Sequence, residues 1–88
     1  MFGETRMNED KLQKIDELCS YIDSLYYKEK LISSQEAEDL IQIISWIKNR
    51  GFEETNIQYT IKELRNCKDV INDKVVSSIV NKFRNACG

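Results

Sequence analysis

Residues 31–52 read LISSQEAEDLIQIISWIKNRGF, and this stretch contains the start, body and end of one helix. Ser33 and Glu36 stand three residues apart, which is the spacing of a capping box, in which each side chain accepts a hydrogen bond from the other residue's backbone amide. Gly51 follows the last apolar residues and is suited to the positive φ that commonly ends a helix. We therefore expect a helix that begins after Ser33 and ends before Gly51.

The apolar side chains of this helix cover more than half of its circumference. At about 100° per residue five of them form one stripe, and Ile43 and Trp46 widen it sideways; the five are Ala37, Leu40, Ile41, Ile44 and Ile47. An arc of roughly 220° exceeds the ~100° stripe of an ordinary surface helix. This helix must therefore be covered on two sides, by other helices of the chain or by a partner, and a homodimer is one way to cover it.

Composition favours a single helical domain. The chain has 88 residues, no proline and three glycines, so long helices are favoured over a sheet. We expect residues 1–7 to be a flexible lead-in and residues 8–88 to form one domain. No run reaches the ~18 apolar residues of a membrane span, and no apolar segment follows residues 1–6 as in a signal peptide. The expected location is the cytoplasm, without membrane contact.

The spacing of apolar residues predicts three further helices. Asn8 is placed to cap the first of them and Asn72 to cap the last. Thr55 and Gln58 form a second capping box, which predicts the start of the third helix. The apolar stripes are Leu12, Ile15, Leu18, Cys19, Ile22, Leu25 and Tyr26 in the first, Ile57, Ile61 and Leu64 in the third, and Val76, Ile79, Val80 and Phe83 in the last.

The predicted fold class is all-α, a compact four-helix domain built from two helical hairpins. The short connection through Leu31 and Ile32 makes the first two helices antiparallel neighbours. With an offset of 39 residues, apolar positions of the first half fall on apolar positions of the second, and Ser33 falls on Asn72. Either a duplicated hairpin or two unrelated amphipathic hairpins with equal loops explains this match. In both cases we expect the two hairpins to pair their apolar faces.

No pattern for catalysis, metal binding or cofactor binding is present. Histidine is absent, and Cys19, Cys67 and Cys87 are widely spaced without a CxxC pair, so we expect neither a zinc site nor a disulfide framework. We interpret Cys19 as buried and Cys87 as part of a fraying tail. The carboxylates of Glu53 and Glu54 suit a helix start. We therefore expect no enzyme, no metal and no cofactor.

The first functional hypothesis is a protein-binding module. The sequence carries more large apolar groups than so small a domain easily buries, and exposed aromatic residues on helices are common interface anchors. The candidate partner-binding residues are Tyr27, Ile43, Trp46 and Phe52. The alternative is that they complete the core. The expected role is that of an adaptor, inhibitor or regulator. The bias toward Ile, Lys and Asn suggests an AT-rich genome, and the small size fits a bacterial, phage or mobile-element regulator.

The second hypothesis is a helix-turn-helix DNA-binding regulator. Residues 43–64 place Gly51 at the turn, and the helix near residues 55–66 would then read DNA through Gln58, Tyr59, Lys62 and Arg65. Residues 43–88 carry eight basic and five acidic side chains, against five and ten in residues 1–42. The total charge of −2 and the acidic helix start argue against DNA. An uneven charge distribution without function also explains the difference.

Residues 51–84 combine a Gly-Phe pair, a helical stripe and the start of another helix, at Gly51, Phe52, Ile57, Ile61, Leu64, Ile71, Asn72 and Asp73. This pattern resembles one three-helix repeat of the RecX regulators, which bind a recombinase filament. The resemblance covers these residues only, and it implies a regulator that acts by binding.

Overall fold

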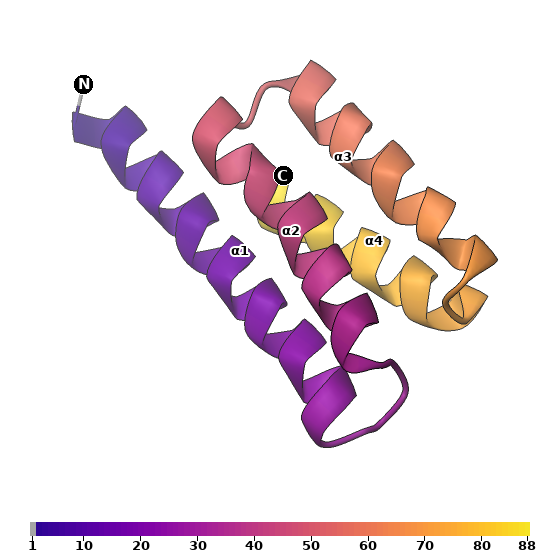
Figure 1. Ribbon diagram of the computed structural model, residues 1–88. Helices are drawn as coiled ribbons and strands as arrows, with labels where there is room; N and C mark the ends of the chain where they lie inside the picture. Colours follow the sequence, from indigo (N-terminus) through magenta and orange to yellow (C-terminus); the bar gives the residue numbers. More distant parts are fainter. Residues whose placement is uncertain (1) are drawn as a thin grey trace.

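The computed structural model describes residues 2–88, with side chains from residue 9 onward. Four α-helices make up most of this part of the chain (Figure 1). They are α1 (Phe2–Tyr27), α2 (Ser34–Arg50), α3 (Glu54–Asn66) and α4 (Asp73–Cys87), and a short 3₁₀ turn, η1 (Cys67–Asp69), follows α3. The described residues contain no strand. The predicted all-α, four-helix fold is confirmed.

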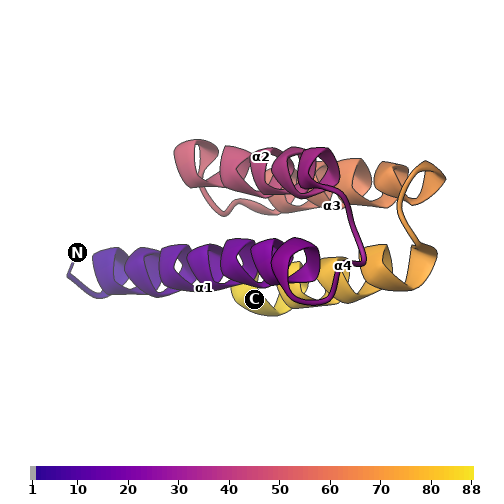
Figure 2. The ribbon, with the colours of Figure 1, turned by 60° about the horizontal axis from the view of Figure 1, so that its bottom comes forward.

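The helices lie in two layers, with α1 and α4 in one and α2 and α3 in the other (Figure 2). Each helix contacts the next along the chain, and α4 returns to contact α1. The α1–α2 hairpin therefore packs against the α3–α4 hairpin through contacts between α1 and α4 and between α2 and α3. This arrangement confirms the predicted pairing of the two hairpins. None of the described helices is both long and apolar enough to span a membrane.

The ends of α2 follow the pattern of residues 31–52. The Ser33 hydroxyl accepts from the Glu36 amide at 3.1 Å, and the Glu36 carboxylate accepts from the Ser33 amide at 2.8 Å, so the capping box is complete. Gly51 has a φ of 98°, and its amide donates to the Ile47 carbonyl at 2.8 Å. At the start of α4, the Asn72 side chain accepts from the Lys74 amide as predicted.

Two predicted helix starts were wrong. The first helix begins at Phe2, so Asn8 lies inside it instead of capping it. Met1 lies outside the described residues, and the flexibility of residues 1–7 stays a prediction. The third helix begins at Glu54 without a side-chain cap. The side-chain amide of Gln58 donates to the Glu54 carboxylate, one turn earlier in this helix, at 2.8 Å. Gln58 therefore forms no capping box with Thr55.

The core is formed by apolar side chains from all four helices. The completely buried ones are Ile15, Ile22, Leu40, Ile44, Ile47, Leu64, Ile79 and Phe83. Among residues 9–88 the buried polar residue is Thr60, and its hydroxyl donates to the Asn56 carbonyl at 3.0 Å. Several positions 39 residues apart have the same environment: Ile22 and Ile61 are both buried, Ile32 and Ile71 are both buried, and Leu31 and Val70 are both exposed. The two hairpins are thus alike in burial as well as in sequence pattern.

Candidate functional site

A cluster of large side chains lies on the outer side of the α2–α3 layer. The rings of Trp46 on α2 and Tyr59 on α3 are 4.8 Å apart between centroids, and the Arg50 guanidinium lies over the Trp46 ring at 5.1 Å. Ile43 stands one turn before Trp46 on the same helix and is half-buried against the core. We call the surface formed by Ile43, Trp46, Arg50 and Tyr59 the aromatic face.

Asn56 fixes the position of this face. Its side-chain amide donates to the Arg50 carbonyl at 3.2 Å and to the Gly51 carbonyl at 3.1 Å. These bonds satisfy two carbonyl groups at the end of α2, which would otherwise lack a helical partner, and they tie the start of α3 to α2. Tyr59 follows Asn56 by three residues and therefore lies on the same side of α3, beside Trp46.

The aromatic face is accessible although it is partly packed. Tyr59 is 49% exposed, Arg50 is exposed, and Trp46 is half-buried. Trp, Tyr and Arg are the residue types most enriched among the energetic centres of protein interfaces. Their mutual contacts order these side chains, and an ordered side chain loses less entropy when it is covered than a mobile one does.

The predicted partner-binding residues do not form one surface. Ile43 and Trp46 lie together on the aromatic face. Phe52 is half-buried in the α2–α3 connection, with the Lys11 ammonium 5.6 Å from its ring centre. Tyr27 is 70% exposed at the end of α1, where its ring contacts that of Tyr26. Tyr27 lies beside the start of α2, whereas Trp46 lies near the end of α2.

The sequence reasoning missed the contribution of Arg50 to this surface. Arg50 follows Trp46 by four residues, which places the two on one helix face. That spacing was a usable signal. The contact between Trp46 and Tyr59 had no comparable signal, because it depends on the register between two helices and on the bonds made by Asn56.

The candidate DNA-reading residues are divided by the fold. Gln58, Lys62 and Arg65 are exposed, whereas the Tyr59 ring contacts Trp46. Figures 1 and 2 show α2 and α3 running side by side in opposite directions, whereas the two helices of a helix-turn-helix motif cross steeply. Glu53 and Glu54 are exposed at the start of α3, where a reading helix approaches phosphates.

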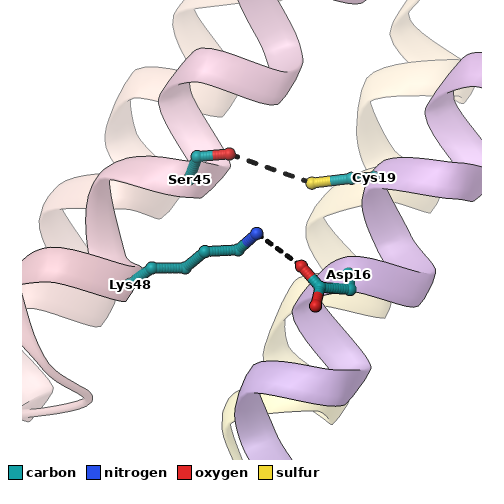
Figure 3. A network of polar contacts seen from close by, with 4 residues as sticks. All are labelled: Asp16, Cys19, Ser45 and Lys48. Carbon is teal, nitrogen blue, oxygen red and sulfur yellow. Dashed lines mark hydrogen bonds and ion pairs between the residues drawn. The ribbon is translucent and has the colours of Figure 1, made fainter.

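A polar network joins α1 to α2 on another side of the bundle (Figure 3). The Lys48 ammonium donates to the Asp16 carboxylate, and this bond raises the pKa of Lys48. About one helical turn away from this bond, Cys19 Sγ and Ser45 Oγ lie 4.0 Å apart. Burial raises the pKa of the Cys19 thiol, so the network contains a protonated thiol and not a thiolate nucleophile. The contacts of this network hold α1 against α2.

The environments of the cysteines differ from the sequence-based interpretation. Cys87 is buried in the last turn of α4, not in a frayed tail, and Cys19 is half-buried. Burial raises the pKa of Cys87 to about 11, and it also raises the pKa of Cys67. All three are free thiols. Within residues 9–88, no group of histidine, cysteine and carboxylate side chains has the arrangement of a metal site.

Comparisons with known proteins found no match for this chain. No protein-family model, no curated protein sequence and no solved structure matches the chain.

Proposed function

We propose that this protein is a small non-enzymatic regulator or adaptor that acts by binding a protein partner through the aromatic face. The observation that supports the proposal is the contact of Trp46 with both Tyr59 and Arg50 on one accessible surface. Three side chains of the types that dominate interface energies are thus held together on two adjoining helices. A partner helix or loop that covers them would also cover the outer side of Ile43.

The hydrophobic part of this surface accounts for the wide apolar arc of α2. One side of the arc packs into the core through Leu40, Ile44 and Ile47. Ile43 and Trp46, on the flank of the arc, are half-buried. The exposed part of this flank is therefore available to a partner, and a second copy of the chain is one candidate for that partner.

Capture experiments with three variants test the proposal. Tagged protein is used to recover partners from a lysate of the organism that encodes it, with and without nuclease and at two salt concentrations. We expect one protein to be recovered under all conditions. Tyr59→Ala and Arg50→Ala should each weaken its binding by at least about tenfold, since interface centres cost 2 kcal/mol or more on truncation. Both side chains are exposed, so the helices should remain folded, which circular dichroism can verify.

Lys62→Gln/Arg65→Gln is the matched control. It changes exposed residues of the same helix that lie outside the aromatic face. We expect this variant to keep the protein partner. If it loses binding, and if nuclease or salt releases the captured material, the DNA-binding alternative replaces the proposal. Light scattering of the purified protein shows separately whether the aromatic face joins two copies.

A further inference from the structure

The two hairpins carry equivalent grooves near their connecting loops. The groove between α1 and α2 has a volume of about 250 Å³, and the groove between α3 and α4 has a volume of about 220 Å³. Six of the seven residues that line the second groove stand 39 positions after residues that line the first. The same offset relates the buried positions of the core, so the grooves are corresponding features of two like hairpins.

These corresponding grooves have opposite charge. Asp23 and Glu38 line the first groove, and no basic side chain lines it. Arg65 and Lys68 line the second, beside Asp73. The Arg65 position of the second groove corresponds to Tyr26 in the first. The first groove therefore differs from its counterpart in two ways. It has two carboxylates and no basic side chain, and it has an aromatic side chain at the position where the counterpart has arginine.

Two neighbouring aromatic residues of α1, Tyr26 and Tyr27, line the first groove. The ring centroids of Tyr26 and Tyr27 are 4.8 Å apart, and the planes are tilted by 57°. Tyr26 is half-buried and Tyr27 is mostly exposed, so the pair presents ring surface to the solvent. Neither Asp23 nor Glu38 takes part in an ion pair within residues 9–88. Lys28 and Lys30 follow in the connecting loop but do not line the groove.

We propose that the α1–α2 groove binds a lysine or arginine side chain from a basic segment of a protein partner. An aromatic ring face attracts a cation through its quadrupole, and the two carboxylates attract it through their charge. The apolar stem of such a side chain would lie against Ile41, which is half-buried in the same groove. This site is separate from the aromatic face and uses Tyr27, which that face does not include.

A titration followed by NMR tests the site. Isotope-labelled protein is titrated with a capped glycine–serine peptide that carries lysines, with its arginine counterpart, and with a peptide in which glutamines replace the lysines. We expect the two basic peptides to shift the amide signals around Asp23, Tyr27 and Glu38, and the glutamine peptide to leave them unchanged. Asp23→Asn/Glu38→Gln should weaken binding by roughly tenfold and Tyr27→Ala by roughly threefold.

Glu53→Gln/Asp69→Asn is the control for net charge, since it also removes two exposed carboxylates but leaves the groove intact. It should reduce binding far less than Asp23→Asn/Glu38→Gln. Equal effects of the two double variants, or equal shifts with the glutamine peptide, would overturn the proposal. So would groove signals that move when the protein alone is concentrated, because the occupant would then be a second copy. Neither result affects the Tyr59→Ala experiment, so the two proposals fail separately.

Discussion

At the scale of single residues, Cys87 shows how burial controls chemistry in this protein. Its side chain is 4% exposed, and its pKa is raised to about 11 from an ordinary value of 9.0. Only the thiolate reacts readily with iodoacetamide. Below pH 9 the folded protein should therefore alkylate at Cys87 at least about a hundredfold more slowly than the urea-unfolded chain, since two pKa units separate their thiolate fractions. Peptide mass spectrometry after timed alkylation measures this ratio.

The same raised pKa predicts how stability depends on pH. Between pH 9 and about 11 the folded state keeps a proton on Cys87 that the unfolded state has lost. The stabilisation from the neutral thiol is thus complete below pH 9 and disappears as the pH rises through 11. The stability difference between the wild type and Cys87→Ala should shrink over this range in urea titrations. A constant difference, or fast alkylation of the folded protein, would contradict the raised pKa.

The burial of Cys87 was predictable from spacing, whereas the Trp46–Tyr59 contact was not. Cys87 follows Phe83 by four residues, so it continues the apolar stripe of α4, and only its place near the end of the chain suggested fraying. Trp46 and Tyr59 lie on different helices. Their contact depends on the hydrogen bonds of Asn56 to the end of α2, and spacing within a single helix contains no information about such bonds.

At the scale of secondary-structure elements, the capping box of α2 makes a quantitative prediction. Ser33→Ala removes the hydroxyl that accepts from the Glu36 amide. We expect it to lower the free energy of unfolding by about 1 kcal/mol, within the usual range of 0.5–2 kcal/mol for a lost N-cap. Ser34→Ala is the control, because Ser34 is exposed in the first turn and is not the cap. Similar losses for both variants in urea denaturation would show that the box contributes nothing.

The two capping-box patterns had different outcomes for a physical reason. Before α2, no residue of the connection occupies the Ser33 hydroxyl, and this hydroxyl accepts from the Glu36 amide. Thr55 follows a tight connection at Gly51, where Asn56 is already bonded to the end of α2. The carbonyl of Glu53 accepts from the Ile57 amide, so the helix has begun before Thr55 can cap it. A local pattern therefore predicted the helix start correctly where no bond to a neighbouring helix competed with it.

At the scale of the whole molecule, the pairing of hairpins follows from the sequence pattern and the surface asymmetry follows only from the structure. Apolar stripes on four helices require that the two hairpins cover each other's apolar faces, and in the structure each helix contacts two neighbours. The equivalence of the two grooves, with opposite charges, requires knowing which side chains reach the surface together. The sequence shows that its two halves differ in charge. It does not show that charges of opposite sign line two corresponding grooves.

Paired hairpins should unfold as one unit, and Ile22 and Ile61 allow a symmetric test. They stand at corresponding positions, with 0% and 2% exposure. Ile22→Val and Ile61→Val should each cost about 0.5–1.5 kcal/mol, which a domain with roughly 4–13 kcal/mol of stability tolerates. Trp46 fluorescence reports the contact between hairpins, and circular dichroism reports all helices. We expect both signals to share one urea midpoint, lowered by each variant to a similar extent. A midpoint that differs between the two signals in either variant would mean that one hairpin stays folded without the other. That result would contradict the prediction, because the four helices share one core.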